Sequence, residues 1–103
     1  MNDLMRPALY GASHRILPVH KSNRKSKTIY EFVGPICEST DKFKTIKNFQ
    51  ELKEKDLVMI CDVGAYGMSL SSNYNMRAKP AELLIKKTKI LVIKKRQKLK
   101  DLM

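Results

Sequence analysis

The stretch GPICESTD, residues 34–41, places a thiol next to two side chains that can bind a charged ligand. Cys37 is followed directly by Glu38 and Ser39, and the Gly-Pro pair before them predicts a turn that holds them at the end of a strand. A cysteine thiol has an ordinary pKa of about 8.5, so it is mostly protonated at neutral pH and can donate a proton. The residues alone leave two interpretations open, a catalytic proton donor or an ordinary structural cysteine. Cys61, inside the apolar segment LVMICDV, is expected to belong to the core.

Two further clusters combine an aromatic ring with a group that can bind a ligand. Arg6 precedes Tyr10 by four residues, so on a helix the guanidinium and the phenol share one face, one turn apart. Such a pair can clamp a carboxylate, because the planar guanidinium matches it bidentately. A surface arginine lying over a ring is the alternative. Tyr66 stands between the two glycines of DVGAYG, which indicates either close approach of a ligand or a tight turn with an exposed tyrosine.

Neither the histidines nor the cysteines form a metal-binding pattern. His14 and His20 have no partners at ligand spacing, and Cys37 and Cys61 are too far apart for a Cys-x-x-Cys pair. We therefore expect no metal site.

The chain has 103 residues and a formal net charge of +11, carried mostly by lysine. This length allows at most one domain. The charge suggests nucleic acid, an anionic membrane or a phosphate-bearing ligand, although a solvated lysine surface is the simpler explanation. The longest apolar runs have about five residues, whereas a membrane helix needs about 18. We expect a cytoplasmic protein without membrane contact.

The predicted elements are mainly β, with a short N-terminal helix. Asp3 can cap this helix, Pro7 suits its first turn and Gly11 can end it. Strands are predicted in TIYEFV, before the Gly-Pro turn, and in DLVMICDV. AELLIKK and KILVIKK predict a hairpin with its turn at Thr88, MSLSSNYN a turn-rich loop, and RQKLKDLM a frayed helical turn.

The segment KFKTIKNFQELKEK is ambiguous. Its apolar residues recur every third position, which resembles one face of a helix. They are Phe43, Ile46, Phe49 and Leu52.

Four segments resemble, in order, the C-terminal part of one enzyme family. They are MNDLMRPALYGASHRILPV, VGPICESTD, DVGAYGMSLSSNYNMRAKPAELLI and LVIKKRQKLKDLM. The chain thereby resembles diaminopimelate decarboxylases, which belong with the ornithine and arginine decarboxylases that depend on pyridoxal phosphate and have the alanine-racemase-like fold. MRPALYG together with GPICES distinguishes it from ornithine decarboxylases. The resemblance implies that residues 1–103 are a fragment of the C-terminal β-domain, a barrel or sandwich that is incomplete without upstream strands and the N-terminal barrel.

The resemblance also implies a reaction, the decarboxylation of meso-diaminopimelate to L-lysine in lysine biosynthesis. Pyridoxal 5'-phosphate would form a Schiff base with a lysine of the barrel and act as the electron sink. Cys37 would protonate the carbon that loses the carboxylate, from a loop supplied across a homodimer interface. The resemblance implies that Glu38 and Ser39 bind the distal end of the substrate. It implies that Arg6 and Tyr10 also bind substrate, and that Tyr66 contacts both substrate and cofactor.

Three positions depart from the family pattern. Thr40 and Lys55 stand where the family commonly has glycine, and Ser13 stands where it commonly has an aromatic residue. The family pattern makes residues 43–55 a loop leading to a strand, and we prefer it to the helical period.

The family's barrel and its cofactor lysine have no counterpart in this sequence, and Met1 resembles an internal methionine used as a start in a split or truncated gene. The isolated chain is therefore expected to be inactive and marginally folded. It would need a separately encoded barrel half or a full-length decarboxylase subunit as its partner.

Two alternatives stay open at this point. The lysine-rich strands, with Tyr30 and Phe32, would suit a small basic nucleic-acid-binding protein, although we expect no nucleic-acid partner. A non-functional remnant of a split decarboxylase gene would also have this sequence.

Overall fold

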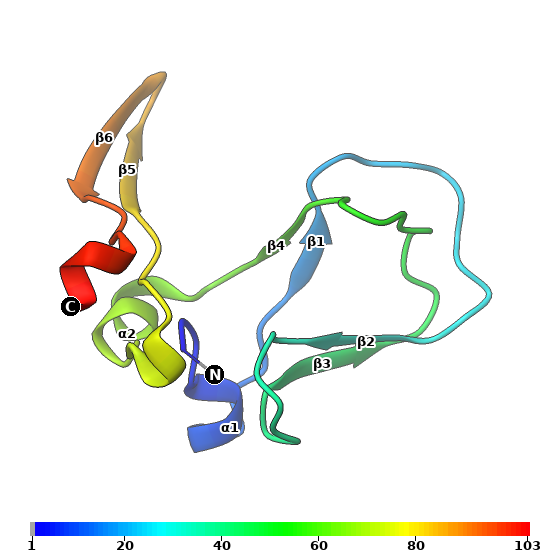
Figure 1. Ribbon diagram of the computed structural model, residues 1–103. Coiled ribbons are helices and arrows are strands. Elements are labelled where there is room, and N and C mark those ends of the chain that lie inside the picture. Colours follow the sequence, from blue (N-terminus) through cyan, green and yellow to red (C-terminus); the bar gives the residue numbers. More distant parts are fainter. Residues whose placement is uncertain (1) are drawn as a thin grey trace.

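The computed structural model describes residues 2–103, and Met1 lies outside the described part. Six short strands form three separate two-stranded antiparallel sheets, pairing β1 with β4, β2 with β3 and β5 with β6 (Figure 1). The strands outnumber the short helices, which confirms the mainly β prediction, but they do not close into a barrel within the described residues. The strands are β1 (Ile16–Pro18), β2 (Tyr30–Val33), β3 (Lys42–Ile46), β4 (Val58–Ile60), β5 (Glu82–Lys86) and β6 (Lys89–Lys94).

The N-terminal helix α1 (Arg6–Tyr10) forms where the sequence predicts it. Pro7 lies in its first turn, and Gly11 ends it with φ 63, in the left-handed region that favours glycine. The predicted cap was wrong, because the helix begins at Arg6 and its N-cap is Met5, which makes no side-chain capping bond. Asp3 is therefore two residues before the N-cap and exposed.

An aromatic cluster packs the loop after β3 against the sheet of β2 and β3. The rings of Tyr30 and Phe32 on β2 both lie against Phe49, with centroids 6.2 and 5.2 Å away, and Phe49 is buried. The helical period of residues 43–55 does not predict the structure, because β3 covers the start of this segment and pairs with β2. The family pattern, a loop that leads to a strand, holds for the part after Ile46, which leads to β4, and misses β3. The three-residue spacing is no sign of a helix here, because Phe43 and Ile46 belong to β3 and Phe49 and Leu52 to the loop after it.

Beyond β4 the chain forms two helical segments that the sequence analysis missed. Helix α2 (Gly64–Ser69) contains Tyr66 in place of the expected tight turn, and the 3-10 helix η1 (Tyr74–Met76) follows within the predicted loop. Glycine and serine have low helix propensity, so the glycines and serines of this segment predicted turns and loops instead of helices. The predicted C-terminal turn is confirmed as the 3-10 helix η2 (Leu99–Leu102).

The β5–β6 hairpin is confirmed, with its turn at Lys87 and Thr88. It stands away from the other sheets (Figure 1). Its apolar side chains are exposed on both faces. Ile85 is 70% and Ile90 64% exposed.

The buried apolar core of the described residues is small, with Leu4, Ile16 and Phe49 as its members. Cys61 is half-buried at the end of β4 and so does not belong to this core, contrary to the prediction. No helix in residues 2–103 is long and apolar enough to cross a bilayer.

Candidate functional site

The loop between β2 and β3, residues 34–41, presents Cys37 to solvent as a free thiol. Backbone hydrogen bonds close the loop on itself. The amide of Gly34 donates to the Asp41 carbonyl at 2.8 Å, and the amide of Asp41 donates to the Glu38 carbonyl at 3.0 Å. A third bond runs from the Glu38 amide to the Ile36 carbonyl at 2.8 Å. The predicted turn is thus a closed loop that holds the thiol at the end of a strand.

The carboxylate of Asp41 fills the inside of this loop. Asp41 is 2% exposed, and its Oδ2 accepts a hydrogen bond from the backbone amide of Ile36 at 2.8 Å. A Cβ atom at position 34 would overlap with this carboxylate, so only glycine fits there without a shift. Sequence reasoning missed Asp41, because an acidic residue in a polar loop is normally expected in solvent.

The carboxylate of Glu38 is bound by a residue that the sequence analysis did not select. The phenol of Tyr74, in η1, donates a hydrogen bond to Glu38 Oε1 at 2.7 Å across 36 residues of sequence. This hydrogen bond, with the negative charge of Glu38, raises the pKa of Tyr74 above its ordinary value of 10.0, and slight desolvation adds to it. Glu38 is therefore held in place on the side that faces η1.

Arg6 and Tyr66, which the sequence analysis selected separately, lie together. The guanidinium carbon of Arg6 is 5.2 Å from the centre of the Tyr66 ring, a cation–π contact between α1 and α2. The predicted partner on the same helix, Tyr10, is 67% exposed. The Nε atom of Arg6 is buried without a hydrogen-bond partner in the described part of the chain, so its donor capacity is not used there.

Two clefts flank the loop. One, of about 590 Å³, lies between α1, the loop and η1, and the Glu38–Tyr74 pair borders it. The other, of about 390 Å³, lies on the side of β3 and is bordered by Ser39. Ala8 and Thr40 line both clefts and so form the ridge between them. Glu38 lies on one side of this ridge and Ser39 on the other. Cys37 lines neither cleft, and no hydrogen bond within residues 2–103 joins its thiol to the other predicted site residues.

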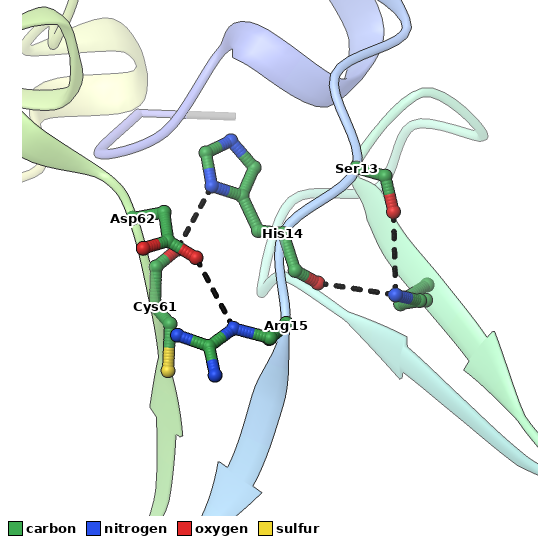
Figure 2. Close-up of polar contacts among 6 residues, drawn as sticks. Ser13, His14, Arg15, Cys61 and Asp62 are labelled. Carbon is green, nitrogen blue, oxygen red and sulfur yellow. Dashed lines mark hydrogen bonds and ion pairs between the residues drawn. The ribbon is translucent and has the colours of Figure 1, made fainter.

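A network around His14 fixes the segment between α1 and β1 against β4 (Figure 2). His14 is 6% exposed, and its Nδ1 lies 2.9 Å from the Cys61 carbonyl oxygen. Arg15 Nε donates to Asp62 Oδ2 at 3.3 Å, an exposed ion pair. The Nζ of Lys44, from β3, donates to Ser13 Oγ at 3.2 Å. This network joins the segment that carries Arg6 to the strand that leads to Tyr66.

No group of three or more histidine, cysteine and acidic side chains in residues 2–103 is arranged to hold a metal ion. Among the polar side chains of the site, the structure brings together Arg6 with Tyr66 and Glu38 with Tyr74.

Comparison with known proteins gives consistent matches. Residues 1–64 match the family described as pyridoxal-dependent decarboxylase, C-terminal sheet domain. A diaminopimelate decarboxylase from Aquifex aeolicus is 40% identical over 94% of this chain and 23% of its own length. One from Helicobacter pylori is 44% identical over 99% of this chain and 25% of its own length.

Solved structures agree with the sequence matches. The diaminopimelate decarboxylase from Helicobacter pylori complexed with L-lysine superimposes with a TM-score of 0.84 at 45% identity, over 99% of this chain and 25% of that one. The enzyme from M. jannaschii in complex with L-lysine gives 0.88 at 38% identity, over 99% and 23%. The chain spans about a quarter of the length of the relatives it matches.

Proposed function

The chain belongs to the pyridoxal-dependent decarboxylase family, matching its C-terminal sheet domain, and from this premise we propose that residues 1–103 form the C-terminal β-domain of a diaminopimelate decarboxylase. The enzyme would convert meso-diaminopimelate to L-lysine and carbon dioxide. The observation that carries the proposal is the closed loop 34–41, which presents Cys37 and Glu38 from a fold shared with diaminopimelate decarboxylases over nearly the whole chain.

Cys37 is the proton donor in this proposal. The bond between the α-carbon and its carboxylate breaks, carbon dioxide leaves, and the electron pair stays on the α-carbon. The thiol proton of Cys37 is then transferred to that carbon, and the thiolate regains a proton from solvent. An exposed thiol on a rigid loop suits this role, because the donor must reach a substrate held by other parts of the enzyme.

Pyridoxal phosphate, when bound, supplies the electron sink for the decarboxylation. The residues present fit an edge contact with such a group: Tyr66 is 66% exposed, and Arg6 holds its ring from one side. The groups that bind the cofactor's phosphate, and the lysine side chain that links covalently to the cofactor, would come from outside these 103 residues.

The other site residues bind and orient the substrate in this proposal. The far end of meso-diaminopimelate carries an ammonium and a carboxylate. Glu38 would bind the ammonium, Ser39 would contribute to binding of the same distal end, and Arg6 and Tyr10 would bind carboxylate oxygens. A substrate lacking either charge would leave a charged group unpaired, which is the physical basis of specificity.

The exposure of Cys37, which lines neither cleft of its own chain, supports a role of this thiol in a second subunit. We propose a homodimer in which each loop completes the partner's site, in the cytoplasm. Each subunit would need the barrel part as well, supplied in the same or a separate chain.

The test is to join residues 1–103 to the upstream part of the Helicobacter pylori diaminopimelate decarboxylase, giving what we call the assembled enzyme. It is expected to form L-lysine from meso-diaminopimelate, whereas the 103 residues alone form none. L-Ornithine and L-arginine, offered to the same preparation, serve as controls for substrate class. A folded, cofactor-loaded assembled enzyme that forms no L-lysine would contradict the proposal.

A further inference from the structure

Tyr74 and Glu38 form a pair that ties the loop 34–41 to η1. The phenol donates to Glu38 Oε1 at 2.7 Å, which is the short distance typical of a hydrogen bond to a charged acceptor. Tyr74 is 51% exposed, so this bond does not arise from burial of the ring. Both residues line the same cleft of about 590 Å³.

The backbone beneath Tyr74 is fixed independently of Glu38. The side-chain amide of Asn2, which is 6% exposed, donates to the Tyr74 carbonyl at 2.6 Å and to the Ser72 carbonyl at 3.3 Å. In return the Ser72 amide donates to the Asn2 carbonyl at 2.9 Å. Asn75 and Met76 follow with φ 56 and 57, in the left-handed region, which turns the chain sharply after Tyr74.

A glutamate on an exposed loop samples several rotamers, and ordering it has an entropic cost. The phenol occupies one carboxylate oxygen and restricts these rotamers before any ligand binds. No hydrogen bond to the second oxygen, Oε2, is formed within the described residues, and Glu38 lines the cleft, so this oxygen can accept from a ligand there.

We propose that Tyr74 is a positioning residue, which orients the carboxylate of Glu38 to receive the distal ammonium group of the substrate. The inference rests on the proposed function and assigns to that site a residue that contacts Glu38 from a separate element. The ligand class that it concerns is any α-amino acid with a second, distal ammonium group, because the proposed function has Glu38 bind that group.

The assembled enzyme tests this with Tyr74→Phe, which removes the phenol oxygen and keeps the ring. The KM for meso-diaminopimelate is expected to rise about tenfold, the effect of losing one hydrogen bond to a charged group. L-Lysine keeps the distal ammonium, so its inhibition constant is expected to rise by the same factor. The kcat is expected to change less than about twofold, because Tyr74 does not touch the reacting carbon.

Two comparisons separate positioning from general damage. Tyr30→Phe removes a phenol that accepts a hydrogen bond from the Leu52 amide at 3.0 Å, away from both clefts, and should leave both constants unchanged. In a Glu38→Gln background, adding Tyr74→Phe should change KM less than about twofold, since Tyr74 acts through that carboxylate.

An active wild-type assembled enzyme in which Tyr74→Phe leaves KM and lysine inhibition unchanged would overturn this inference and leave the proposed function standing. Equal effects of Tyr74→Phe with and without Glu38→Gln would overturn it as well. An inactive wild-type assembled enzyme would instead overturn the proposed function, and this inference with it.

Discussion

The carboxylate of Asp41 occupies the space that a side chain on Gly34 would need, so these two residues together close the loop that carries Cys37. The contact is between a buried acid and a bare α-carbon, at the base of the loop where β2 ends and β3 begins. The position of the thiol thus depends on two residues that do not take part in the proposed chemistry.

Gly34→Ala is expected to destabilise the assembled enzyme by about 1–3 kcal/mol, because the new methyl group overlaps with the Asp41 carboxylate. In an Asp41→Ala background the same change should cost less than about 1 kcal/mol, since the space is then open. Denaturant unfolding of the four proteins measures the coupling. Gly67→Ala is the matched control: its Cβ would lie 3.4 Å or more from its neighbours, in a helix, where alanine is favoured. Additive costs for Gly34→Ala and Asp41→Ala would contradict the steric argument.

Lys55→Gly is expected to stabilise the protein by about 0.5–1 kcal/mol. Lys55 has φ 72, in the left-handed region where a side chain is strained and glycine is not. Thr40 also stands where the family commonly has glycine, yet it is not among the residues with left-handed backbone, so Thr40→Gly should give no stabilisation. The difference is measured by denaturant unfolding. Equal effects at both positions would show that the backbone conformation is not the cause.

The titration of Tyr74 is expected to reflect its bond to Glu38. The pKa of Tyr74 is raised in the folded protein, so the contribution of the neutral phenol to stability is fully present below about pH 10, the pKa of the unfolded chain, and is lost as pH rises through the raised pKa. Ultraviolet absorbance titration, taken as the difference between the protein and its Tyr74→Phe variant, should therefore show a phenol with a raised pKa, and Glu38→Gln should lower that pKa. If Glu38→Gln left the pKa of Tyr74 unchanged, the hydrogen bond between Tyr74 and Glu38 would not be formed in solution.

Local sequence patterns predicted the pieces of the site that depend on neighbouring residues. The Gly-Pro turn placed Cys37 at the end of β2, and Pro7 and Gly11 marked the two ends of α1. Two apolar runs on either side of a polar turn predicted the β5–β6 hairpin, because a hairpin pairs neighbouring segments of the chain.

Contacts between distant segments could not be predicted in this way. The spacing on α1 suggested Tyr10 as the partner of Arg6, but the helix has 5 residues and the guanidinium lies over Tyr66 of α2. Tyr74 meets Glu38 across 36 residues of sequence, and the buried side chain of Asn2 holds η1 at the N-terminal segment. The roles of Cys37, Ser39, Tyr10 and the other site residues remain proposals, whereas the membership of the family is established by the match over residues 1–64.

The measurement that tests the central claim most directly is the kcat of the assembled enzyme with Cys37→Ala, compared with Cys61→Ala. Loss of a positioned general acid is expected to lower kcat about 100- to 10,000-fold, with the KM for meso-diaminopimelate little changed. Cys61 is half-buried, its amide donates to the Arg15 carbonyl, and its carbonyl oxygen lies 2.9 Å from His14 Nδ1. Its substitution should leave kcat within about twofold. A Cys37→Ala enzyme that keeps kcat within about threefold of the wild type would contradict the assignment of this thiol as the proton donor.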